Sequence, residues 1–221
     1  MVAVMSRRHT PTPSATGRSG RPGRPRSAAA DTAILEATRA ALVELGWSGL
    51  SMGDVAARAG VAKTTLYRRW AGKNELVVDA VAVLFDELEL PDRGSLAADV
   101  RGVVRQFAAL LARPEARTAL MAVVSEATRD EPLRERIRVS IVERQKRLVL
   151  EGRARARARG ELPAPATGRE DGTDADDDLV FDVIAGAVVH RALVSGQPVD
   201  EEWIGRLTAL LLGGLGVAAR D

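Results

Sequence analysis

The stretch from Leu50 to Leu76, LSMGDVAARAGVAKTTLYRRWAGKNEL, has the pattern of two short helices joined by a tight turn. Ser51 stands where an N-cap side chain accepts a backbone N–H, so the first helix is expected to follow it and to run to about Ala59. Gly60 suits the sharp turn because glycine adopts backbone angles that other residues avoid. The second helix is expected over Ala62–Trp70. Two short helices that cross steeply around a small apolar core form a helix-turn-helix.

The second of these helices is expected to expose polar and basic side chains, namely Lys63, Thr64, Tyr67 and Arg68. A single helix fits the major groove of B-DNA, where side chains near its N-terminus reach the edges of the bases. Lys63 can donate to guanine acceptors, and Thr64 can offer its hydroxyl group, or its methyl group to thymine. Tyr67 can touch a base or a phosphate. The alternative, that these are ordinary surface residues, is disfavoured by the pattern around them.

The whole stretch resembles the helix-turn-helix of the TetR family of transcription regulators. The shared features are a small polar cap, an alanine-rich first helix, a glycine and a valine at the turn, and a short helix that contains Leu-Tyr. The likeness continues through Trp70 and the Gly-Lys-x-Glu-Leu sequence of Gly72–Leu76. It implies a three-helix DNA-binding domain at the N-terminus, followed by a helical domain that binds a ligand and forms a dimer.

The resemblance also implies contacts to the phosphates that flank the groove. The matching residues are Thr65, Tyr67, Arg69 and Lys73. Phosphate contacts fix the register of a protein on DNA, so Lys63 and Thr64 would supply more of the base preference. Ser51 and Gly53 complete the predicted DNA-binding surface. Gly53 departs from the family pattern, because many relatives carry a long polar residue there that can reach a base. Either base recognition by this helix is poorer in this protein, or the N-terminal arm compensates for it.

Helical periodicity extends on both sides of this stretch. Residues 31–76 are expected to form the DNA-binding domain and residues 77–221 a regulatory and dimerisation domain. The first helix is expected to begin with Asp31 or Thr32 as its cap and to end at Gly46. A fourth helix would open at Lys73 or Asn74 and end before Pro91, and the five that follow are expected at Ser95–Ala112, Pro114–Thr128, Pro132–Arg159, Asp178–Ser195 and Asp200–Val217. The prediction is an all-α fold of about nine helices, with a loop over residues 160–177.

The composition agrees with helices and disfavours catalysis. Hydrophobic residues make up 46% of the chain and aromatic residues only 3%, while leucine, alanine and arginine, which are good helix formers, are abundant. There is no cysteine, and of the two histidines His9 lies in the arm and His190 in a predicted helix. We therefore expect no enzyme, no cofactor and no metal site. No run approaches the roughly 18 apolar residues of a membrane span, so we expect a cytoplasmic protein with no membrane partner.

Residues 1–30 are expected to form a disordered basic arm, because they lack apolar periodicity. Within the arm, Gly20–Arg26 reads GRPGRPR and is similar to an AT-hook core, although Pro22 replaces the arginine that should precede Gly23. Arg21 and Arg24 can enter a narrow minor groove. The alternatives are an unselective attraction to phosphates or an inert tail.

The last two predicted helices are expected to form the interface of a homodimer. Each carries an apolar stripe, and small Gly186 permits close approach between helices. The predicted interface residues are Val180, Val183, Ile184, Ala187, Val188, Arg191, Ile204, Leu207, Leu211 and Leu215. A dimer would hold two helix-turn-helix units at a fixed spacing, as a palindromic operator requires. The alternative is that both helices close the core of a single subunit.

A ligand pocket is expected among the middle helices, as the resemblance implies. The candidate lining residues are Phe107, Leu110, Leu111, Leu120, Met121, Val124, Ile141 and Phe181. Gln106, Arg144 and His190 can supply polar contacts, but residues of these types more often lie at a surface or interface. The sequence names no ligand class.

Together these features predict a ligand-responsive repressor that binds a palindromic DNA operator as a homodimer and responds to a small-molecule effector. Two alternatives stay open: a transcriptional activator with the same fold, and an architectural protein that binds DNA with little specificity. An enzyme that merely retains a helix-turn-helix is disfavoured by the lack of catalytic groups.

Overall fold

The computed structural model describes residues 28–163 and 175–215, and all secondary structure within these ranges is helical. Two helices contain a π-helical turn: η1 joins α7 to α8, and η2 extends α9. Counting each of these as one helix, the described residues form nine helices, as the sequence predicts. The elements are α1 Ala28–Gly49, α2 Met52–Arg58, α3 Lys63–Tyr67, α4 Lys73–Phe85, α5 Leu96–Ala112, α6 Pro114–Ala127, α7 Glu131–Ile137, η1 Arg138–Val142, α8 Glu143–Ala158, α9 Ala175–Val189, η2 His190–Val194 and α10 Glu201–Gly214.

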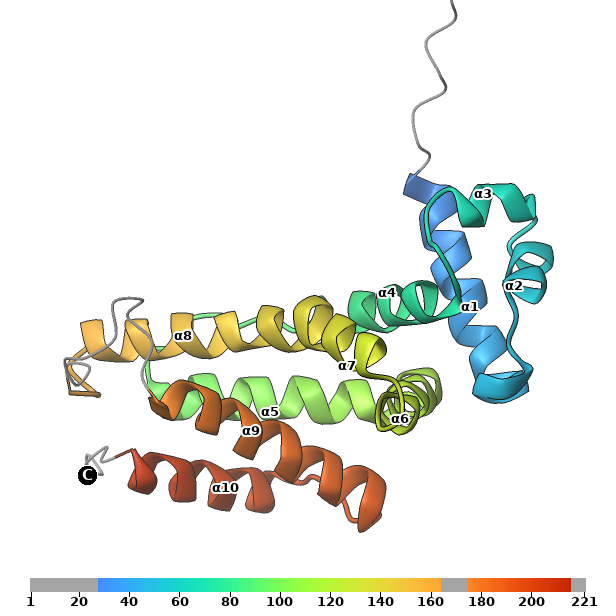
Figure 1. Cartoon of the computed structure of the whole chain (residues 1–221). Helices are drawn as coiled ribbons and strands as arrows, with labels where there is room; N and C mark the ends of the chain where they lie inside the picture. Colours follow the sequence, from blue (N-terminus) through green and yellow to red (C-terminus); the bar gives the residue numbers. More distant parts are fainter. Residues whose placement is uncertain (1–27, 164–174, 216–221) are drawn as a thin grey trace, which may run out of the picture.

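The first three helices form a head at one end of the molecule (Figure 1). Ser51 caps α2: its hydroxyl oxygen accepts from the backbone N–H of Asp54, whose carboxylate accepts in return from the backbone N–H of Ser51. Gly60 has a φ of 65° and makes the predicted tight turn into α3. Leu66 and Trp70 are buried and fix α3 against the head.

Several helix boundaries differ from the prediction. α1 begins at Ala28, so Asp31 lies in its first turn and is not its cap, although helical geometry does break at Gly46, where φ is 68°. α3 ends at Tyr67 and not at Trp70, because residues 68–69 form a turn. The helix predicted over Pro132–Arg159 is interrupted by η1, which periodicity cannot reveal because a π-helical turn inserts only a local shift.

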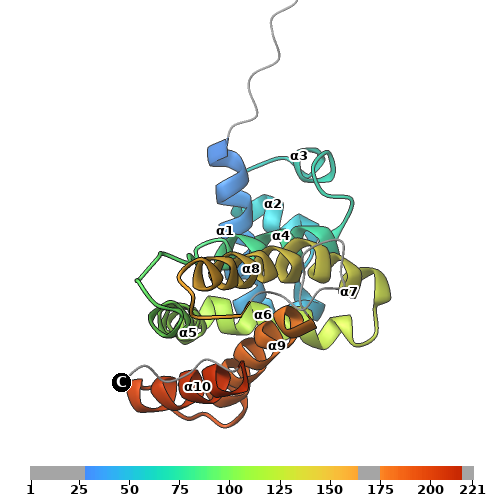
Figure 2. The same cartoon turned by 90° about the vertical axis from the view of Figure 1, so that its left-hand side faces the viewer.

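The regulatory body extends away from the head, with α4 as the connection between them (Figures 1 and 2). α8 and α5 run along the body, α9 crosses beside α5, and α10 lies farthest from the head. One continuous apolar core runs from the head through α4 into the body. Within the described ranges, no helix is both long enough and apolar enough to cross a bilayer.

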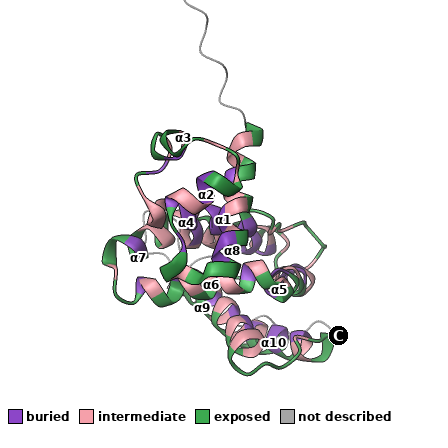
Figure 3. Cartoon of the chain, turned by 90° about the vertical axis from the view of Figure 1, so that its right-hand side faces the viewer, coloured by how far each residue is buried: buried purple, intermediate pink, exposed green. Residues whose placement is uncertain are grey.

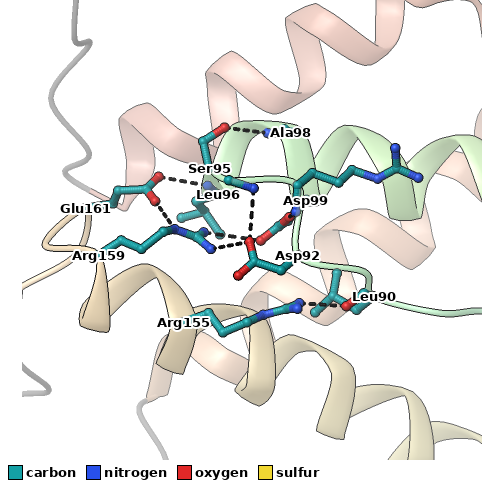
Figure 4. A network of polar contacts seen from close by, with 11 residues as sticks. Leu90, Asp92, Ser95, Leu96, Ala98, Asp99, Arg155, Arg159 and Glu161 are labelled. Carbon is teal, nitrogen blue, oxygen red and sulfur yellow. Dashed lines mark hydrogen bonds and ion pairs between the residues drawn. The ribbon is translucent and has the colours of Figure 1, made fainter.

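A polar network fastens the link between α4 and α5 to the end of α8 (Figure 4). The guanidinium of Arg159 donates to Asp92 at 2.8 Å and to buried Asp99 at 3.2 Å, and it also pairs with Glu161. Arg155 donates to the carbonyl oxygen of Leu90 at 2.8 Å. The link that follows α4 is therefore held against the far end of the body.

Candidate nucleic-acid interface and internal cavity

α3 projects from the head with most of its side chains in solvent (Figure 3). Lys63, Thr64, Tyr67 and Arg68 are exposed, and Tyr67 is 56% exposed although it is a large aromatic residue. Leu66 points inward and is fully buried. The structure thus brings together on one surface the four residues that the sequence assigned to the reading helix.

Gly53 lies directly beneath Lys63. A Cβ atom added at Gly53 would come within 2.8 Å of both Cε and Nζ of Lys63. The lysine therefore lies across the start of α2 in space that a larger residue would fill. Ser51, beside them, uses its side chain as a helix cap, and its hydrogen bond holds the pKa of the Asp54 carboxyl below its ordinary value.

Two residues predicted to hold phosphates have partners within the protein. Arg69 forms an ion pair with Asp31 in α1, and its side chain is only 14% exposed. Lys73 donates from Nζ to the carbonyl oxygen of Trp47 at 2.9 Å and lies 5.0 Å from the centre of the Trp47 ring. Both residues tie α1 to the elements that follow α3. Thr65 is half-buried.

A polar bridge, which the sequence did not reveal, links the head to the body. The indole Nε1 of Trp70 donates to Asp79 of α4 at 2.8 Å, and Arg136 of α7 donates to the other oxygen of Asp79 at 3.1 Å. Arg136 also contacts Glu75 at 3.4 Å, and Glu75 accepts from the backbone N–H of Ala71. No local sequence signal could place Arg136 here, because its partners lie 57 and 61 residues away in the chain.

The body contains a cavity of about 110 Å³. It lies between α5, α8, α9 and α10, with the end of α4 closing one side. Three of the predicted pocket residues, Phe107, Ile141 and Phe181, line it. The sequence missed most of the lining because several helices have apolar faces and spacing alone does not show which of them surround a cavity. The missed lining residues include Asp99, Gln145, Leu148, Arg153 and Ala185.

The other apolar residues predicted to line the pocket do not line the cavity. Leu110 and Leu111 are buried in the core but lie outside the cavity lining. Met121 and Val124 are 41% and 47% exposed on α6, on the surface of the subunit. Leu120 is partly buried and packs against the core.

The three polar candidates for the pocket lie outside it as well. Arg144 forms an ion pair with Asp86 at 2.8 Å, where both side chains reach solvent. The side-chain amide of Gln106 holds the backbone of Glu89: its oxygen accepts from the N–H of Glu89 at 3.1 Å, and its nitrogen donates to the carbonyl oxygen of Glu89 at 2.9 Å. His190 is exposed near Ser195.

The predicted interface residues divide into two groups. Six are buried within the subunit itself, namely Val180, Ile184, Val188, Ile204, Leu207 and Leu211. Their assignment to a surface between subunits is therefore wrong, because the strongest apolar stripe of each helix faces the subunit's own core. The others are half-buried: Val183, Ala187, Arg191 and Leu215.

α9 and α10 nevertheless present apolar residues outward. Leu179 of α9 is 57% exposed, Val194 of η2 is 67% exposed and Leu210 of α10 is 72% exposed. Nothing lies within 4 Å of a Cβ built at Gly186 of α9 or at Gly213 of α10, so the surface is open at these glycines. We call the solvent-exposed sides of α9, η2 and α10 that carry these five residues the outer face.

Some predictions concern residues beyond the described ranges. Arg21 and Arg24 of the basic arm lie outside them, as do residues 164–174 of the predicted loop. Among the described residues, no group of histidine and acidic side chains is arranged to hold a metal ion.

Comparison with known proteins matches both parts of the chain to one family. Residues 34–80 match the model described as "Bacterial regulatory proteins, tetR family". Residues 90–211 match "Tetracyclin repressor-like, C-terminal domain". The first match covers most of the head and most of α4, and the second runs from the α4–α5 link into α10.

Individual relatives agree with these matches. The chain is 33% identical to the DNA-binding transcriptional repressor TetR of Mycobacteroides abscessus, over 79% of this chain and 87% of the relative. It is 27% identical to the uncharacterized HTH-type transcriptional regulator YdeS of Bacillus subtilis, over 82% of this chain and 87% of that one. A crystal structure of a TetR family transcription regulator superposes with a TM-score of 0.65 at 30% identity, covering 84% and 97% of the two chains. The chain belongs to the TetR family of DNA-binding transcription regulators.

Proposed function

We propose that this regulator is a repressor that binds a palindromic operator as a homodimer and releases it when a small molecule occupies the body. The observation that carries the proposal is the exposed surface of α3, where Lys63, Thr64, Tyr67 and Arg68 lie together on a helix of groove width. Lys63 and Thr64 stand at the N-terminal end of α3 and would read bases, while Tyr67 would contact the backbone.

Dimerisation would use the outer face. Leu179, Val194 and Leu210 are exposed apolar residues of α9, η2 and α10, and the open surface at Gly186 and Gly213 lets a second copy approach closely. Two subunits joined there would hold two heads at a fixed separation. A palindromic operator matches that symmetry.

A response to a small molecule is supported by the cavity, which lies in the body and is lined at one side by the end of α4. α4 also carries the bridge to Trp70, so a change at the cavity has a direct connection to the head. A ligand shifts the equilibrium only by binding one arrangement of the heads better than another. Such a regulator would act in the cytoplasm, where it meets the chromosome. A transcriptional activator would use the same reading helix, dimer interface and cavity.

Selection of DNA from random duplexes by the purified protein tests this proposal. We expect a palindrome bound at least a thousandfold more tightly than random DNA at matched salt, a ratio on the order of that for specific regulators. Nearly equal affinity for all duplexes would contradict it and indicate an architectural protein.

Variants of α3 test the assigned roles. Lys63→Ala should relax base preference at one position of each half-site, at a cost of about 1–3 kcal/mol for the preferred base. Tyr67→Phe should weaken binding to all sequences alike. Arg101→Ala, an exposed arginine on α5, is the control and should change neither property. Unaltered base preference in Lys63→Ala would contradict the proposed readout.

A further inference from the structure

Gly53 lies in α2 at a position where the backbone does not require glycine. It is the second residue of a seven-residue helix, and its φ is not positive, unlike that of Gly60 in the turn that follows. Glycine weakens a helix relative to alanine, because it gives up more backbone freedom on folding. A helix as short as α2 has little stability of its own to lose. What glycine supplies here is therefore space and not a backbone conformation.

The end of the Lys63 side chain occupies this space. A Cβ atom built at Gly53 would lie 2.8 Å from both Cε and Nζ of Lys63, well inside the roughly 3.5 Å at which carbon atoms come into contact. The next nearest atom, Oγ of Ser51, would be 3.5 Å away, which is an ordinary contact. Any side chain at position 53 must therefore move the lysine, whereas Ser51 can stay in place.

The ammonium group of Lys63 is held by its position against Gly53 and not by a polar partner. Across the described ranges it takes part in no hydrogen bond or ion pair, whereas Arg69 and Lys73 both have partners within the head. Lys63 is also the first residue of α3, where the positive end of the helix dipole does not favour a cation. All three of its N–H donors are therefore available to a base.

We propose that Gly53 is a positioning residue that sets the base preference of this protein through Lys63. Because position 53 has no side chain, the flexible stem of Lys63 can lie against α2 and keep its ammonium group in one place. An ammonium group in one place meets the guanine acceptors at one position of a half-site, while a mobile one also reaches phosphates and other bases. The inference rests on the function proposed above, in which α3 reads DNA.

Nuclear magnetic resonance of the free, full-length protein, with ¹³C at Cε of lysine, tests the position of the side chain. The lysines of the chain are Lys63, Lys73 and Lys146, so the signal that Lys63→Ala removes is that of Lys63. We expect a nuclear Overhauser effect between the Hε protons of Lys63 and the Hα protons of Gly53. In Gly53→Ala the Lys63 signal should move to the shift of a freely mobile lysine. The control Gly205→Ala, inside α10 where an added Cβ atom meets nothing within 4 Å, should leave the signal in place.

Selection of DNA from random duplexes tests the effect on base preference. Gly53→Ala should lower the preference for one base, at one position of each half-site, about fivefold, which is near the lower end of what a single side-chain contact discriminates. In a chain that already carries Lys63→Ala, the same substitution should change nothing further. A direct contact from the new methyl group to a base would persist without Lys63, so the double variant separates the two explanations. Gly205→Ala should leave the preference unaltered.

The outcomes separate this inference from the proposed function. Both glycine variants should keep or raise the urea midpoint of the unaltered protein, because alanine favours a helix over glycine. A Lys63 signal that Gly53→Ala leaves in place, or a base preference that Gly53→Ala leaves unchanged or alters equally without Lys63, would overturn the inference while the proposed function stands. If the unaltered protein selects no palindrome, the proposed function fails, and the inference fails with it even where the Lys63 signal moves.

Discussion

At the scale of single residues, the head depends on Ser51. α2 has only seven residues, and a helix that short has few internal hydrogen bonds with which to hold itself. The hydroxyl group and backbone of Ser51 exchange hydrogen bonds with Asp54, which satisfies N–H groups that the helix itself cannot. α2 in turn supports α3 through Val55 and Leu66, both buried.

Ser51→Ala should lower the free energy of unfolding by about 1 kcal/mol, the usual cost of losing such a cap. Urea denaturation at neutral pH measures it. Ser125→Ala, at an exposed position inside α6, removes a hydroxyl group without removing a cap and should be neutral. Equal stability of Ser51→Ala and the unaltered protein would show that the cap is dispensable.

The same pair of variants gives a pH dependence. The Ser51 hydrogen bond lowers the pKa of Asp54 in the folded protein, so the stabilisation is fully present above the unfolded pKa of about 3.9. It is lost as the pH falls through the lowered folded value. The stability difference between Ser51→Ala and the unaltered protein should therefore shrink below about pH 4, whereas a difference that grows on acidification would contradict the role of the Asp54 carboxylate.

At the scale of helices, apolar spacing predicted the existence and order of the elements but not what each face contacts. Val180, Ile184 and Val188 recur at intervals of four, which defines one face of α9 clearly. Periodicity carries no information about whether that face meets the same subunit or another one. The structure places it in the subunit's core and leaves Leu179 and Leu210, which in the sequence adjoin the buried residues Val180 and Leu211, on the outer face.

The site divides in the same way. The residues of α3 are consecutive, so their arrangement follows from the helix alone, and the sequence identified them. The cavity and the Arg136 bridge join residues from helices that are distant in the chain, and their positions depend on how those helices pack. The partners of Arg69 and Lys73 were missed for this reason too, since Asp31 and Trp47 approach them only in the folded head.

Leu210→Arg tests the outer face as an interface. In a two-fold symmetric dimer the substitution places an unpaired charge on both sides of the buried surface, which strongly disfavours association. Sedimentation should show a shift from dimer to monomer mass. The control is Val139→Arg, which replaces an apolar residue of η1 that is 52% exposed and lies off the outer face. It should leave the mass unchanged. A dimer of unaltered mass for Leu210→Arg would place the interface elsewhere.

At the scale of the whole molecule, one continuous helix connects the cavity to the head. Arg136 lies on α7, and Ile141, which lines the cavity, follows on η1 in the same helix. Arg136 holds Asp79, and Asp79 holds Trp70 directly after α3. A rotation or shift of this helix at the cavity would therefore move the group that orients the reading helix. The π-helical turn begins two residues after Arg136 and contains Ile141, and such turns often mark functional sites.

Arg136→Met should loosen α3 without unfolding the body. Asp79 and Glu75 would lose the cation that they share, so Trp70 would be held less firmly. Backbone N–H groups that donate to carbonyl oxygens of α3, such as that of Trp70 to Leu66, should then exchange with solvent several-fold faster. Operator affinity should fall several-fold because the heads are less well oriented. Arg134→Met, on the same helix, removes an ion pair with exposed Glu131 and a hydrogen bond to the carbonyl oxygen of Ala127 at 3.3 Å, but no contact with α4, and it should alter neither measurement. If Arg136→Met changes operator affinity no more than Arg134→Met does, the contact between Asn74 and Asp130, at 2.8 Å the other polar link between α4 and the start of α7, must carry the coupling.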